Sequence, residues 1–274
     1  MSNEVPRVHH TIIARFHEIV TGQMLADRQA PPNTVVAPVP CPLCGHSPDN
    51  WTHMLLMCEH KDVSPYYTKR HDAAGKALLH HLSDGTMARW LTLTNFGRID
   101  GDPMDQTVPD WLLSPIGKAD LRRGPTGEQG IKPDTIILEG WPSDAPPPTG
   151  PVSHYRAPNG RKSKLTLHIV ELGFCSDLRH RDKYAQKQSH YVPLEEALTA
   201  HGWNVHPRTH IITVGVRATV PERNHDVLTG LGITDEKART RLQEELVRIS
   251  AKHIAIIITH IRKLHGPQKR LGVG

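Results

Sequence analysis

The chain has 274 residues, and its 33 lysines and arginines against 28 acidic residues give a formal net charge of +5. With 37% hydrophobic residues, it is too apolar and too varied for a fully disordered protein. The longest apolar run, residues 254–258, is far shorter than the ~20 residues of a membrane span, and the first residues show no signal-peptide pattern. We therefore expect a soluble protein of the nucleus or the cytoplasm, with no membrane partner.

The N-terminal part predicts two helices on either side of a cysteine-rich segment. Apolar residues recur at helical spacing over residues 8–27, before Pro31 and Pro32, and again over residues 65–83. Three of the four cysteines lie between these helices, within 18 residues. In a protein without an export signal, such clustering favours metal ligation over disulfide bonds.

The cysteine-rich segment predicts a small structural zinc knuckle. Two cysteines three residues apart can turn onto one ion, and the full ligand set is Cys41, Cys44, His53 and Cys58. Zinc prefers this tetrahedral sulfur and nitrogen set, and four protein ligands leave no open position for catalysis. His46 and His60 are alternative ligands. The alternative to a zinc site is a set of buried cysteines that bind no metal. We expect Cys175 to be a small core residue.

The remainder of the chain predicts an α/β core. Short apolar runs predict strands at 90–96, 136–138, 165–172 and 211–216. Helical patterns cover residues 180–201, interrupted early by Pro193, and residues 235–264. Residues 100–130 and the proline-rich insertion 141–163 are expected to be mostly loop. This order of elements fits an α/β or α+β core with a small metal-binding appendage.

Two carboxylates and two lysines indicate a candidate catalytic site. Asp134 directly precedes one predicted strand, and Glu171 lies near the end of the next. If these strands are neighbours, a buried carboxylate pair results, which a divalent cation must neutralise. Mg²⁺ suits such oxygen ligands and could activate water against a phosphodiester. Lys183 and Lys187 share one helix face, although turn and surface roles are the ordinary use of such residues.

The ordered set of motifs resembles the C-terminal region of site-specific non-LTR retrotransposon polyproteins, which carries a zinc knuckle and a restriction-like endonuclease of the PD-(D/E)XK superfamily. The similarity covers roughly residues 10–217 and rests on the runs 41–45, 49–58, 66–72, 132–134, 170–172 and 183–184. Each run alone is short, and only their order makes the resemblance specific.

The resemblance implies a restriction-endonuclease-like core of helix, mixed central sheet and helix, flanked by an N-terminal helix, the knuckle and a long C-terminal helix. The expected domains are 1–64, 65–218 and 219–274. It implies that Asp134 and Glu171 bind Mg²⁺ or Mn²⁺, that Lys183 or else Lys187 is the catalytic lysine, and that the DNA-contacting residues are Arg70, His71 and Tyr184. The superfamily's lysine position is Gly173 here, so the lysine must come from another element.

The resulting hypothesis is a divalent-metal-dependent endonuclease that nicks DNA so that the freed 3′-hydroxyl primes reverse transcription. The partners implied are DNA, element RNA and a reverse transcriptase, whose aromatic-x-Asp-Asp motif does not occur in this sequence. One alternative is a catalytically inactive, zinc-containing module that only binds nucleic acid. Another is an interaction domain that docks through the helix 235–264.

Overall fold

A computed structural model of the chain describes residues 40–45, 52–83, 90–96, 108–122, 131–216 and 218–265. The helix predicted over residues 8–27 and the alternative ligand His46 lie outside these residues. None of the described helices is long and apolar enough to cross a membrane.

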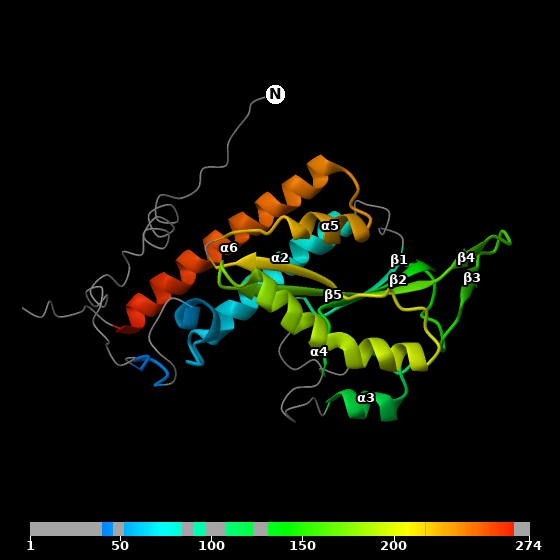
Figure 1. Ribbon diagram of the computed structural model, residues 1–274, viewed down its shortest axis with the longest axis horizontal. Helices are drawn as coiled ribbons and strands as arrows, with labels where there is room; N and C mark the ends of the chain where they lie inside the picture. Colours follow the sequence, from blue (N-terminus) through cyan, green and yellow to red (C-terminus); the bar gives the residue numbers. More distant parts are fainter. Residues whose placement is uncertain are drawn as a thin grey trace, which may run out of the picture.

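The described residues form a mixed sheet between two layers of helices (Figure 1). The strands, in spatial order, are β1 (Trp90–Thr94), β2 (Thr135–Pro142), β5 (Thr166–Cys175) and β6 (His210–Gly215). β2 runs antiparallel to both β1 and β5, whereas β5 and β6 are parallel. The predicted α/β class with a mixed central sheet is therefore confirmed.

Helices cover both faces of the sheet (Figure 1). One face carries α3 (Pro115–Arg122) and α4 (His180–Ala200), and the other carries α2 (Ser64–Ser83), α5 (Arg223–Gly230) and α6 (Glu236–His265). The central strand β5 supplies both cores: Ile169 packs with the α4 layer, while Val170 and Leu172 pack with the α2 layer. Burial of both faces explains why this strand is almost continuously apolar.

Four segments differ from the sequence-based expectation. The expected loop 100–130 contains α3, and the segment between β6 and α6 contains α5. The insertion 141–163 includes a two-stranded hairpin of β3 (His154–Arg156) and β4 (Lys162–Lys164), which projects from the end of the sheet (Figure 1). Helix α4 runs on through Pro193, whose ring is exposed, so the expected interruption is wrong. At that position solvent can hydrate the carbonyl that a proline leaves unbonded.

The cysteine-rich segment packs against the second half of the long helix. Its short π-helix η2 (His53–Met57) contributes Leu55 to a separate apolar cluster with Ile254, Ile257 and Ile258 of α6. Because α6 also packs against α2 and the sheet, the same helix joins the cysteine-rich segment to the core.

Candidate functional site

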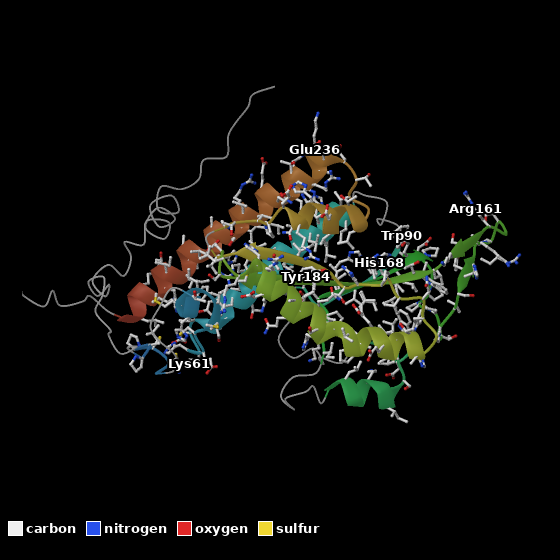
Figure 2. All side chains as sticks on the ribbon, in the orientation of Figure 1. Lys61, Trp90, Arg161, His168, Tyr184 and Glu236 are labelled. Carbon is white, nitrogen blue, oxygen red and sulfur yellow. The ribbon has the colours of Figure 1, made fainter. Side chains whose placement is uncertain are left out.

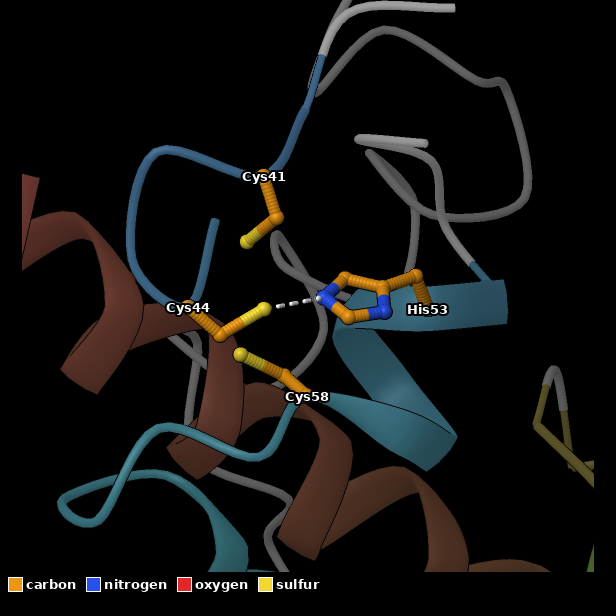
Figure 3. Close-up of side chains that lie close together, drawn as sticks. All are labelled: Cys41, Cys44, His53 and Cys58. Carbon is orange, nitrogen blue, oxygen red and sulfur yellow. Dashed lines mark hydrogen bonds between the residues drawn. The ribbon is translucent and has the colours of Figure 1, made fainter. Parts of the chain in front are cut away.

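Three cysteines and one histidine converge beside η2 (Figure 3). One ligand atom from each of Cys41, Cys44, His53 and Cys58 lies within 4.8 Å of the others, and the Sγ of Cys44 is 3.2 Å from the Nε2 of His53. The turn between the first two cysteines closes with a 2.8 Å bond from the Gly45 amide to the Cys41 carbonyl. Gly45 has φ 71°, a backbone conformation that favours glycine. The predicted ligand set is thus assembled, and His60 is not part of it.

The chemistry of these four groups fits a structural metal ion such as zinc. Burial, together with the neighbouring Cys41 and Cys44, raises the pKa of the Cys58 thiol to about 12. Three thiolates side by side need a cation, and zinc binds such a sulfur and nitrogen set. The four-residue group could therefore hold zinc with no position left open.

Two side chains from α2 hold the η2 turn in place. The Tyr67 hydroxyl donates to the Met54 carbonyl at 2.6 Å, and the Arg70 guanidinium donates to the Leu55 carbonyl at 3.0 Å. Arg70 is only 1% exposed, and its guanidinium carbon lies 4.3 Å from the centre of the Phe174 ring. Burial lowers the pKa of Arg70 to about 10. Arg70 is thus committed to the η2 backbone and to Phe174 and also lines the pocket described below, and its contact with DNA stays a prediction.

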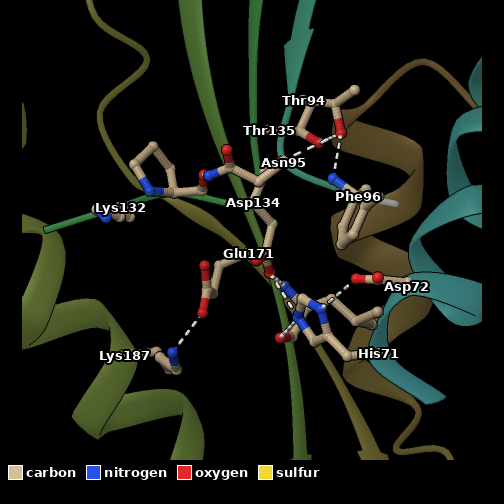
Figure 4. Close-up of polar contacts among 12 residues, drawn as sticks. His71, Asp72, Thr94, Asn95, Phe96, Lys132, Asp134, Thr135, Glu171 and Lys187 are labelled. Carbon is tan, nitrogen blue, oxygen red and sulfur yellow. Dashed lines mark hydrogen bonds and ion pairs between the residues drawn. The ribbon is translucent and has the colours of Figure 1, made fainter. Parts of the chain in front are cut away.

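The two predicted carboxylates lie side by side on adjacent strands, Asp134 just before β2 and Glu171 within β5 (Figure 4). Asp134 precedes β2, and the pairing of Thr135 with Val170 brings it opposite Glu171 of β5. The amide of Leu172 donates to Oδ2 of Asp134 at 2.8 Å, which fixes this carboxylate against β5. Both acidic residues are buried.

Glu171 is held by two side chains of α4. Lys187 forms an ion pair with Oε1 of Glu171, and the Tyr191 hydroxyl lies 2.5 Å from Oε2. Burial raises the pKa of Glu171 to about 7, and the charge of Asp134 adds to the rise, while Lys187 opposes it. The glutamate is therefore costly to ionise without a nearby cation. Sequence reasoning did not assign Tyr191 to the site, although it lies one helical turn beyond Lys187.

Asp134 has a histidine partner on the other side. The Nε2 of His71, in α2, lies 3.1 Å from Oδ2 of Asp134 and 3.2 Å from the carbonyl oxygen of Leu172. Desolvation lowers the pKa of His71, but the bond to Asp134, the charges of Asp134 and Glu171 and the bond to Leu172 together outweigh it, so the net change is upward. His71 is therefore beside the site, as predicted, and orients an acidic residue. Both bonds to Asp134 go to Oδ2, which leaves Oδ1 available to a cation.

The two candidate lysines occupy different places above β5. Lys187 makes the contact with Glu171, whereas the Nζ of Lys183 lies 3.3 Å from Oε1 of Gln186. A Cβ atom at Gly173 would lie 3.5 Å from Cε of Lys183. Lys183 thus covers the position where a side chain at residue 173 would stand, and Lys187 reaches the acid. The lysine that contacts the carboxylate is therefore Lys187, which the sequence analysis named second, after Lys183.

A pocket of about 740 Å³ opens over these groups. The carboxylates of Asp134 and Glu171 line it together with the cations Lys132, Arg179, Lys183 and Lys187. Tyr184 is not among the described residues that line it; its ring instead packs 3.4 Å from the Arg223 guanidinium, in a second pocket. Helix α4 turns Tyr184 toward α5 rather than toward the carboxylates, and its contact with DNA stays a prediction.

No known family model matches the chain, and no curated protein matches it in sequence.

Proposed function

We propose that the protein is a divalent-metal-dependent DNA endonuclease with a restriction-endonuclease-like core, similar to the nuclease of site-specific non-LTR retrotransposons. The observation that carries the proposal is the pair Asp134, directly before β2, and Glu171, opposite it within β5, with Lys187 on the second acid. Buried, paired carboxylates cost stability, and groups with such perturbed pKa values are concentrated at functional sites.

The donor set fits Mg²⁺ or Mn²⁺. Carboxylate oxygens are the ligands these ions prefer, and a cation between Asp134 and Glu171 would relieve the repulsion that raises the pKa of Glu171. When bound, the ion supplies Lewis-acid activation of the phosphodiester and of a water molecule. His71 and Tyr191 hold the two carboxylates in place, and Lys187 offsets negative charge beside them.

The order of elements supports the nuclease fold. A helix, antiparallel strands, a helix and a parallel strand follow one another as in the core that the resemblance implies. Lys183 fills the space over Gly173, the position where that superfamily carries its lysine. In this proposal, the lysines of α4 take the place of the superfamily's lysine, which would otherwise stand on β5.

Basic residues on the projecting hairpin and around the acidic pocket favour DNA as the substrate. The hairpin β3–β4 leaves the sheet at the far end of β2 from Asp134 and exposes Arg156, Arg161, Lys162 and Lys164, of which Figure 2 labels Arg161. Cations on such a projection contact phosphates rather than bases, and they contribute affinity that falls as salt rises. The cations around the acidic pocket suit the same backbone.

The test is conversion of supercoiled plasmid to nicked circles by the full chain. We expect nicking with Mg²⁺ or Mn²⁺ and none with EDTA or with Ca²⁺ alone. Salt-sensitive DNA binding without nicking under any of these conditions would instead favour a catalytically inactive binding module, which the basic hairpin alone would support. Absence of both nicking and DNA binding would refute both the endonuclease and the binding module.

The lysines provide a sharper expectation. Lys187→Met should lower the nicking rate by ~10²-fold, because it removes a charge that stabilises the transition state, whereas Lys183→Met should lower it by less than ~10-fold. Since Lys187 keeps the pKa of Glu171 down, its loss should also move the acidic limb of the rate profile to higher pH. Rates measured from pH 5 to 9 check both points, and an equal loss in the two variants would contradict this assignment.

A further inference from the structure

Three histidines gather beside the central strands, outside the acidic pocket. His168 lies on β5, His206 in the loop before β6, and His210 at the start of β6; Figure 2 labels His168 beside the sheet. One nitrogen from each ring lies within 4.8 Å of the others, and Nδ1 of His168 is 3.0 Å from Nε2 of His210. His168 and His210 are buried. Nothing in the proposed nuclease chemistry uses this cluster.

The hydrogen bonds around the cluster decide which nitrogens are free of protons. Nε2 of His168 donates to the Glu139 carboxylate at 2.6 Å, which leaves its Nδ1 as a lone pair. Nδ1 of His206 donates to the carbonyl oxygen of Arg208 at 2.9 Å, which leaves its Nε2 as a lone pair. Histidines that bind metals usually donate their other N–H group to a carboxylate or a carbonyl in this way.

The ring nitrogens of the cluster are also spaced as ligands of one ion would be. The separation of 3.0 Å between ring nitrogens is close to that of two ligands at ~2.0–2.1 Å from one tetrahedral ion.

We propose that His168, His206 and His210 form a second zinc site, oriented by Glu139 and distinct from the cysteine-rich knuckle. Neutral imidazoles suit zinc among the divalent ions, and three protein ligands leave a fourth position for water. His206 and His210 line a pocket of about 470 Å³, so the fourth position has access to solvent. Gly230 keeps this pocket open beside His210, because a Cβ there would lie 3.3 Å from the ring.

The test is zinc content and zinc X-ray absorption of the full chain after exposure to zinc and dialysis. We expect two zinc ions per chain, with half as many sulfur ligands per zinc as the knuckle alone would give. His206→Ala should leave one zinc with the full sulfur number. The matched control His154→Ala replaces an exposed histidine of the hairpin and should keep both ions.

A wild-type chain that holds one zinc with the full sulfur number would overturn the second site, whether or not the protein nicks DNA. Two ions retained in His206→Ala would overturn it as well. Glu139→Gln provides a milder variant that keeps all three ligands, and we expect ~10–100-fold weaker zinc binding at this site, measured by competition with a chelator. Unchanged affinity in Glu139→Gln would contradict the orienting role of that carboxylate.

Discussion

Replacing Cys44 with serine should unfold the cysteine-rich segment and loosen the second half of α6. Structural zinc contributes ~10 kcal/mol or more to the folding of small zinc modules, and a hydroxyl is a poor replacement for a thiolate ligand. The segment shares its apolar cluster with Ile254, Ile257 and Ile258, so its loss exposes that stripe of α6. We expect a lower unfolding temperature and faster amide exchange over residues 52–60 and 254–261.

Cys175→Ser is the matched control for this prediction. It makes the same thiol-to-hydroxyl change at a buried cysteine outside the ligand group, where Sγ lies 3.5 Å from Nδ1 of His180. This variant should keep the zinc and the exchange pattern of the wild type. If Cys44→Ser retained thiolate-bound zinc and normal protection of α6, the knuckle would not be a structural metal site.

The effect of zinc loss should extend to the acidic pocket. Thr52, Leu56 and Met57, from the η2 segment, line that pocket together with Asp134. Arg70 links the two regions, because it bonds the Leu55 carbonyl and stacks on Phe174 of β5. Zinc removal by a chelator should therefore weaken activity even though zinc takes no part in the chemistry.

The sequence predicted those parts of the fold in which the local order of apolar residues indicates which residues are buried. The strand that became β5 could be recognised because Leu167, Ile169 and Val170 leave no polar face. The short helix α3 could not, since glycines, prolines and acidic residues surround it and its formation depends on packing by Leu112 and Leu121. A helix of eight residues is too short to be stable alone, so tertiary contacts decide whether it forms.

Some features of the candidate site could likewise be predicted from the sequence, and others could not. Asp134 and Glu171 could be paired in advance because each belongs to one of two successive strands, and neighbouring strands bring such side chains together. The burial of Arg70 could not be foreseen, because it depends on Phe174, more than a hundred residues away. The histidine cluster likewise becomes visible only once β5 and β6 are paired.

Changing Asp134 to asparagine should reduce DNA nicking by ~10³-fold or more while leaving the fold intact. The asparagine keeps an oxygen that can accept the bonds from Leu172 and His71, so the geometry is preserved. What is lost is the negative charge that holds the divalent ion, and Lewis-acid activation is worth several kcal/mol, at ~1.4 kcal/mol per tenfold in rate. Glu171→Gln should behave in the same way. Single-turnover nicking rates in Mg²⁺, with DNA affinity measured in parallel, provide the measurement.

Asp182→Asn is the control that separates metal binding from a general charge effect. Asp182 also lines the pocket, but it is exposed and pairs with Arg179 at 3.2 Å, on the helix rather than on the strands. Its substitution removes the same charge, and because exposed ion pairs contribute little, we expect a rate within a few-fold of the wild type. DNA binding should persist in Asp134→Asn, since that change removes negative charge near the phosphates. A variant Asp134→Asn that nicks as fast as Asp182→Asn would mean that the paired carboxylates hold no catalytic ion, and the endonuclease proposal would fall with them.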